Sequence, residues 1–187
     1  MGALLEVFSG FGLSASAGLN AYIPLLVTAL LAKFTNLIQL DEPWDALTSG
    51  WIIGLLIVLT MIEFFLDKVP AVNHFNDVVQ SLVRPTAGAI VFAASANVIT
   101  DIHPVLALAL GLLIAGSVNL VKTAAVRPAV SATTAGVGNV PVSFMEDATS
   151  TGVSILSIVV PIAAAGIFIF FIIWAIWRYV IRPLTNG

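Results

Sequence analysis

The sequence contains no cysteine among its 187 residues, and only 9% of those residues are charged. Without cysteine the chain cannot form a disulfide, use a thiol nucleophile or hold a metal through thiolates. Soluble domains have about 25% charged residues, so the low charge argues against a soluble protein. The net charge is −3 and no basic run is present, so we expect no nucleic-acid partner.

What the sequence has in abundance is apolar residues, which make up 59% of it and give a mean hydropathy of +1.08. A helix needs about 20 mostly apolar residues to cross a membrane. Several such stretches are present, and the length suits one compact bundle. We therefore predict an all-α integral membrane protein with one domain, 1–187. The start of the chain lacks the basic residues of a cleaved signal, so we expect its first helix to insert itself.

Hydropathy predicts helices at 4–33, 50–66, 84–100, 104–122 and 153–179. The first should bend between Asn20 and Pro24, because proline removes a backbone hydrogen bond. In 67–83 the apolar residues recur at roughly helical spacing among polar ones, so we expect that piece to lie along the membrane interface.

The stretch 130–144 is weakly apolar, and its interpretation decides the topology. If it crosses the membrane, the chain has six spans with both termini in the cytoplasm, where Lys and Arg are enriched. Six of the seven basic residues then fall on the cytoplasmic side, namely Lys68, Arg84, Lys122, Arg127, Arg178 and Arg182, and only Lys33 does not. The acids fall outside, namely Asp41, Glu42, Asp45, Asp101, Glu146 and Asp147. We favour this topology, and the alternative is five spans with a re-entrant segment.

Two uncharged stretches rich in small residues, 11–24 and 131–141, share hydroxyl residues, an Ala-Gly pair, an Asn and a Pro. Small residues at four-residue spacing let helices approach closely in lipid. A buried Asn needs a partner, which hydrocarbon does not offer. We interpret both stretches as an inner lining, with Asn20 and Asn139 at its midpoint and Ser14 and Ser16 as further candidates for solute contact. The alternative for each is helix packing alone.

Charged residues within or beside the predicted helices are the other candidates. Glu63 lies in a predicted span, where an acid is a functional candidate by default. With Asp67 it could attract or relay a cation or a proton. We expect gating ion pairs at the cytoplasmic end from Lys68, Asp77, Arg84 and Arg127. We place Glu146 and Asp147 at the outer mouth, where solvated loop acids are the alternative.

A repeat of three hairpins is a further hypothesis, because two predicted helices open with Arg-Pro, at Arg84-Pro85 and Arg127-Pro128. Chance similarity between Gly/Ala-rich helices would explain the pattern equally well. A stripe of small residues, Ala107, Gly111 and Ala115, is suited to internal packing or to a contact between subunits.

No HExxH, GxSxG, P-loop or dinucleotide motif is present. The two histidines, His74 and His103, are predicted on opposite sides of the membrane, so they cannot share a metal. We expect no metal and no cofactor. Whether the chain is an enzyme stays open, and a two-acid enzyme using Asp67 and Asp77 is the least favoured function.

Four motifs carry a resemblance to a known family: residues 12–24, 67–70 and 84–88, and 139–141 followed by Glu146-Asp147. At these residues the chain resembles a bacterial membrane family described as domain of unknown function 4126, over nearly its whole length. The resemblance implies a small multi-pass protein of the inner membrane. It implies no catalytic residue.

The leading functional hypothesis is a small transporter or channel for a small ion or polar solute. Six short spans make a thin wall, so we expect a homo-oligomer in the lipid bilayer. The alternative is a membrane scaffold or assembly partner that transports nothing.

Overall fold

The computed structural model describes residues 2–68, 70–96, 103–160, 167, 170–174 and 177, with side chains from residue 7 onward except those of 70–75. Over these residues the chain is helical and contains no strand, which confirms the predicted all-α class. The helices are α1 (Gly2–Leu19), α2 (Tyr22–Phe34), α3 (Gly50–Leu66), α4 (Pro70–Ala96), α5 (Pro104–Val121), α6 (Arg127–Thr134) and α7 (Asn139–Val159). A 3-10 turn, Trp44–Thr48, precedes α3, and a π-helical turn, Lys122–Val126, joins α5 to α6.

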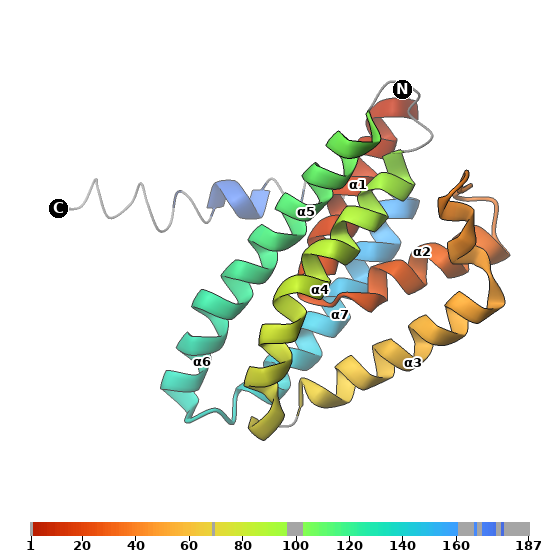
Figure 1. The fold of residues 1–187 in the computed structure, drawn as a ribbon. Coiled ribbons are helices and arrows are strands. Elements are labelled where there is room, and N and C mark those ends of the chain that lie inside the picture. Colours follow the sequence, from red (N-terminus) through yellow and green to blue (C-terminus); the bar gives the residue numbers. More distant parts are fainter. Residues whose placement is uncertain are drawn as a thin grey trace.

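Four helices, α1, α4, α5 and α7, pack side by side as the main bundle, while α2 and α3 form a V on one side of it (Figure 1). The end of α3, the start of α4, α6 and the start of α7 gather at one end of this bundle. We call it the lower end, as in Figure 1. The chain's N-terminus lies at the opposite end.

The predicted bend in the first helix is a complete break between α1 and α2. Asn20 produces it, because its side-chain Oδ1 accepts the backbone N–H groups of Tyr22 and Ile23 at 3.1 Å each. This is the way an asparagine caps the start of a new helix. Pro24 then falls in the first turn of α2, where its missing N–H costs no hydrogen bond.

Helix α3 has the predicted boundaries, but α4 begins earlier than expected and carries Pro85 in its interior. The stretch 67–83 is therefore mostly the first half of α4 and not a separate interfacial piece. Asn76, Gln80 and Arg84 recur every four residues along α4, and all three are buried. The polar face that suggested contact with water is turned into the protein instead.

The stretch 130–144 does not form one crossing helix, which is what the six-span topology requires of it. Helix α6 ends at Ala135 and Gly136, whose φ angles of 51° and 86° are left-handed. Left-handed residues at this position end a helix. The chain then reverses, and α7 starts at Asn139, well before the predicted start at 153. Because α6 and α7 are separate helices joined by this turn, the structure does not confirm six spans.

Small residues bring α4, α5 and α1 close together. A methyl group added at Gly88 on α4 would overlap the Ala115 side chain on α5, and one at Gly18 on α1 would lie 2.6 Å from the Ala115 carbonyl oxygen. Ala107, Gly111 and Ala115 are all on the buried face of α5. The stripe of small residues therefore serves packing inside the chain, which decides between the two roles considered for it.

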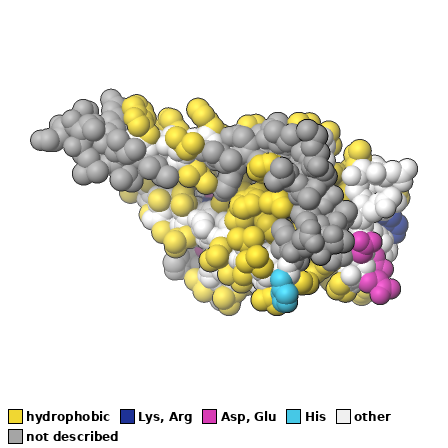
Figure 2. All heavy atoms as spheres, turned by 90° about the horizontal axis from the view of Figure 1, so that it is seen from above, with side chains coloured by type: hydrophobic (Ala, Val, Ile, Leu, Met, Phe, Trp, Pro, Cys, Tyr) yellow, Lys and Arg dark blue, Asp and Glu magenta, His cyan; other side chains and the backbone are white. Residues whose placement is uncertain are grey.

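Large apolar side chains lie on the outside of the molecule. Trp51 on α3 is 82% exposed, and Phe65 on α3 and Leu113 on α5 are 62% and 63% exposed. Seen from above, hydrophobic side chains cover much of the described surface, and acidic ones gather at one edge (Figure 2). Two helical segments, Asn76–Ala96 and Pro104–Thr134, are long and apolar enough to cross a membrane.

Candidate functional site

Seven charged side chains meet at the lower end of the bundle, and we call them the charge cluster. They come from α3, α4, the π-helical turn, α6 and α7, and from the α3–α4 connection. The members are Glu63, Asp67, Asp77, Arg84, Lys122, Arg127 and Glu146. Six of them are buried, and Asp77 is partly exposed. Burying a charge is costly unless it is paired, so the pairing within this cluster decides whether the fold can hold it.

Asp67 is at the centre of the cluster. Its Oδ2 lies 3.5 Å from Arg84 Nη2, 3.4 Å from Arg127 Nη2 and 3.6 Å from Lys122 Nζ. Its Oδ1 accepts a hydrogen bond from Asn76 Nδ2 at 2.6 Å. Burial alone would raise the pKa of Asp67, but the charges of Lys122, Arg84 and Arg127 outweigh it and hold the pKa below its usual value. Asp67 is therefore ionised at neutral pH.

Arg84 joins the cluster to the break between α1 and α2. Its Nη2 and Nε donate to Glu63 Oε1 at 3.0 and 3.3 Å, and its Nη1 donates to Asn119 Oδ1 at 3.0 Å. The other oxygen of Glu63 accepts the backbone N–H of Ala21 at 3.2 Å. One acid thus balances a buried guanidinium and also satisfies an N–H group that the helix break leaves open.

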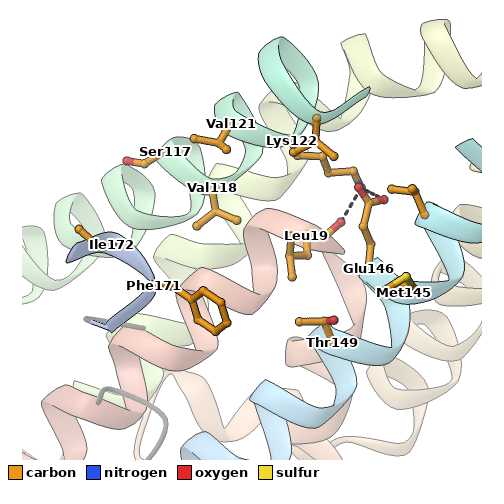
Figure 3. Close-up of a pocket in the computed structure, with 12 residues that line it drawn as sticks. Leu19, Ser117, Val118, Val121, Lys122, Met145, Glu146, Thr149, Phe171 and Ile172 are labelled. Atoms are coloured by element: carbon orange, nitrogen blue, oxygen red, sulfur yellow. Dashed lines mark hydrogen bonds and ion pairs between the residues drawn. The ribbon is translucent and has the colours of Figure 1, made fainter. Parts of the chain in front are cut away.

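Glu146 binds the other two cations of the cluster. Its Oε2 lies 2.9 Å from Lys122 Nζ and 2.8 Å from Arg127 Nη2. Lys122 Nζ also donates to the carbonyl oxygen of Leu19, the last residue of α1, at 2.8 Å. Figure 3 shows the Lys122 side chain reaching toward both partners.

These contacts correct the placement of Glu146 and Asp147 at an outer mouth, away from the basic residues. Asp147 Oδ2 lies 2.8 Å from Lys68 Nζ, so both acids pair with cations that the six-span topology put on the other side of the membrane. The reversal after α6 is the physical reason, because it returns the start of α7 to the end of the bundle where α3 ends.

A column of serine hydroxyls runs from this end of the bundle along the α1–α7 contact. Ser16 Oγ lies 2.8 Å from Ser150 Oγ and 2.6 Å from Ser154 Oγ, and Ser9 Oγ donates to the carbonyl oxygen of Ser157 at 2.6 Å. We call these five serines the hydroxyl column. Ser14, the other predicted serine, is not part of it, because its Oγ donates to the Gly88 carbonyl on α4 at 2.9 Å.

Asn20 is buried next to the lower end of the column, where its Nδ2 donates to Asp147 Oδ1 at 3.0 Å. Asn139 lies apart from it, at the first residue of α7, and donates to Ser131 Oγ at 2.8 Å. Eight residues of α7 separate Asn139 from Asp147, which corresponds to roughly 12 Å of helix. The structure does not bring the two asparagines to a shared midpoint.

Sequence reasoning missed Lys122 and the serines of α7 as parts of the site. A signal for both is present in the sequence. Five of the six buried positions of α7, 143, 147, 150, 154 and 157, alternate in steps of four and three and so lie on one helix face, and the sixth, Glu146, is next to them. On α5 the buried stripe 107, 111, 115 and 119 leads directly to Lys122.

A cavity of about 510 Å³ borders the charge cluster on the outside, between α5 and α7 (Figure 3). Its walls are mostly apolar, including Val118, Val121 and Met145, and Lys122 and Glu146 are its charged residues. Among the described residues, no group of three or more acids or histidines is placed to hold a metal ion. The side chain of His74 is outside the described residues.

The fold and the site together define a class: an all-helical protein with an apolar exterior, a column of buried hydroxyls and a buried charge cluster. The chain belongs to the family described as Domain of unknown function (DUF4126), whose model matches residues 7–180. This confirms the resemblance seen in the sequence. No curated protein and no solved structure matches the chain.

Proposed function

We propose that this chain is a multi-pass membrane protein that passes a small ion or polar solute, as a transporter or a channel. The observation that carries the proposal is the reversed distribution of polarity. Ser16, Ser150 and Ser154 are fully buried, together with most of the charge cluster, whereas Trp51 and Phe65 are largely exposed. Exposed apolar surface of this extent is unfavourable in water and neutral in lipid.

The orientation follows from the basic residues at the lower end. Lys68, Arg84, Lys122 and Arg127 all lie there, and Lys and Arg mark the cytoplasmic side. We therefore propose that the lower end faces the cytoplasm. The N-terminus is at the opposite end of the bundle, so this orientation replaces the expected cytoplasmic N-terminus with an outer one.

Two helix contacts in the same bundle favour transport over a scaffold role. Gly88, Gly111 and Ala115 let α4 pack closely against α5, and the hydrogen bond from Arg84 to Asn119 joins the two helices at the charge cluster. The α1–α7 contact is formed by serines and an Asn–Asp pair along more of its length. We propose that these buried groups exchange their mutual hydrogen bonds for bonds to a solute during its passage.

The two-acid enzyme has less support from the geometry. A catalytic acid or base must reach its substrate. Asp67 is 2% exposed and its Oδ2 is surrounded by Arg84, Lys122 and Arg127, so a substrate has little access to it.

A homo-oligomer stays a proposal, and its contact would have to use a face other than the small-residue stripe of α5. The exposed apolar face of α3 is available for it.

The test is flux through purified protein in liposomes, across a panel of cations, anions and small polar metabolites. In the Ser16→Val variant the added bulk obstructs the hydroxyl column. The matched control is Ser117→Val, because Ser117 is exposed on α5. We expect selective flux that Ser16→Val removes and Ser117→Val keeps, with both variants eluting as folded protein. Absence of flux from folded wild-type protein across the panel would overturn the proposal in favour of a scaffold.

A further inference from the structure

We infer that the charge cluster binds one monovalent cation, a proton or an alkali ion, between Asp77 and Gln80 on α4. If the chain transports a solute as proposed, this cation is the transported substrate, and only that role rests on the proposed function. The binding site itself is argued from the charges and contacts below.

The first step is the charge balance of the cluster. Among the side chains that the structure describes, its acids are Glu63, Asp67, Asp77 and Glu146 and its bases are Arg84, Lys122 and Arg127, so three positive charges face four negative ones and leave −1. The adjacent Lys68–Asp147 pair is balanced by itself. An uncompensated charge among buried groups is unfavourable, and one added positive charge removes it.

The second step is to find the acid that carries the excess. Glu63 and Glu146 have a cation at 3.0 Å or closer, and Asp67 has three cations within 3.6 Å. Asp77 has Arg84 Nη1 at 4.0 Å, and within the described part of the chain its buried Oδ1 has no hydrogen-bond partner. The excess negative charge therefore belongs to Asp77.

Gln80 supplies the second oxygen of the site. It is 3% exposed, and its Oε1 is buried without a hydrogen-bond partner. Three residues separate it from Asp77, so the two side chains are neighbours on one face of α4. Both unpartnered atoms are acceptors. A proton held by Asp77 could be donated to Gln80 Oε1, and an alkali ion could bind both oxygens, since hard cations prefer oxygen ligands.

The surroundings select the charge of the ligand. Asp77 faces Arg127, Arg84 and Lys122 from three elements, with Asp67 as the nearby acid. A divalent ion would leave a net positive charge among these three cations, and an anion would be repelled by the Asp77 carboxylate. The Asp77 side chain is 17% exposed, so a small ion can reach it from solution.

The test is thermal unfolding of the full chain in detergent, for wild type, Asp77→Asn and the control Asp45→Asn. Asp45 lies in the 3-10 turn before α3 and is outside the charge cluster. In one arm choline chloride is replaced by NaCl or KCl at constant ionic strength and pH. In the other arm the pH is lowered from about 8 to 6 in choline chloride. Asp77→Asn keeps the shape of the side chain and removes its charge, so it is expected to fold.

We expect the unfolding temperature of wild type and Asp45→Asn to rise in one arm, and the same rise to be absent in Asp77→Asn. The arm that responds identifies an alkali ion or a proton. Gln80→Leu is expected to lose the response as well. A wild type that responds in neither arm, or an Asp77→Asn variant that responds like wild type, would overturn the inference. An Asp77-dependent response in protein that shows no flux would instead keep the site and overturn the transport proposal.

Discussion

Arg127 Nη2 lies 3.4 Å from Asp67 Oδ2, although the two residues are 60 positions apart in the chain. Arg84 reaches the same oxygen at 3.5 Å. The two Arg-Pro pairs that the sequence suggested as repeats therefore direct their arginines to one acid. Their prolines differ, because Pro85 is inside α4 and Pro128 is in the first turn of α6. The likeness between the two motifs extends to the arginine contact and not to the helix around it.

Replacing Asp67 by Asn should destabilise the protein strongly. The change leaves Arg84, Lys122 and Arg127 with one acid fewer in a buried site. Breaking a buried ion pair from one side costs about 3–5 kcal/mol. We expect a loss of this order in the free energy of unfolding, measured by denaturant titration in detergent. Asp45→Asn is the control, and an equal, small effect of both changes would contradict the central role of Asp67.

The same acid makes stability depend on pH in a defined direction. The folded-state pKa of Asp67 is below its ordinary value of 3.8. The stabilising contribution of Asp67 to the free energy of unfolding is therefore fully present above pH 3.8. It is lost as the pH falls through the folded-state pKa. The difference in unfolding free energy between wild type and Asp67→Asn should therefore shrink on acidification below about pH 4. A difference that grows in acid would show the opposite sign and exclude this account.

Arg84→Lys should be destabilising even though it keeps the charge. Arginine binds Glu63 and Asn119 simultaneously through its planar fork, and lysine has no such fork. We expect a loss of about 1.5–3 kcal/mol, the range for hydrogen bonds to charged groups. The exposed-site control is Lys33→Arg, which should leave the unfolding free energy nearly unchanged. Wild-type stability in Arg84→Lys would mean that charge alone holds the cluster.

Gly88→Ala and Gly54→Ala should affect stability in opposite directions. A methyl at Gly88 meets Ala115 on α5, whereas Gly54 on α3 has no atom within 4 Å of an added methyl. Overpacking costs about 1–3 kcal/mol. Alanine at Gly54 should instead stabilise α3 by up to about 1 kcal/mol through its helix propensity. Unfolding temperatures of the two variants test this, and equal shifts would argue against close α4–α5 packing.

The absence of cysteine allows a direct test of the α1–α7 register. Ser16 and Ser154 have their hydroxyl oxygens 2.6 Å apart, so cysteines at both positions should form a disulfide on mild oxidation. The control pair is Ser117→Cys with Ser154→Cys, since Ser117 is exposed on α5. A mobility shift on non-reducing gels reports the bond. Cross-linking in the control alone would place α7 against α5 instead.

The sequence correctly predicted those features of the fold that depend on residues close together in the chain. The boundaries of α3 follow from one uninterrupted apolar run, and the change of direction at Asn20 follows from a capping residue close to a proline. For the same reason Glu63, Asp67, Arg84 and Arg127 could be selected from the sequence, because charge inside an apolar chain is conspicuous. The sequence also predicted that Lys68, Asp77, Arg84 and Arg127 lie at one end of the protein, and there they form ion pairs.

The remaining features depend on contacts between distant residues. Hydropathy could not show that Asn76 and Gln80 face the protein interior, because a polar face turned inward and one turned to water have the same period. The reversal after α6 depends on Ala135 in a left-handed conformation, which is not a residue that favours it. Without that reversal, the pairing of Lys122 with Glu146 could not be expected.

The span of the charge cluster along the chain has a consequence for biosynthesis. Arg84 is synthesised 17 residues after its partner Asp67, but Arg127 only 60 residues after it. At about 5–20 residues per second, the nascent chain therefore carries an incompletely neutralised acid for several seconds. On the proposed membrane topology, the charge cluster is completed only after α6 has been synthesised. Stable packing of the α3–α4 hairpin then depends on the late helices.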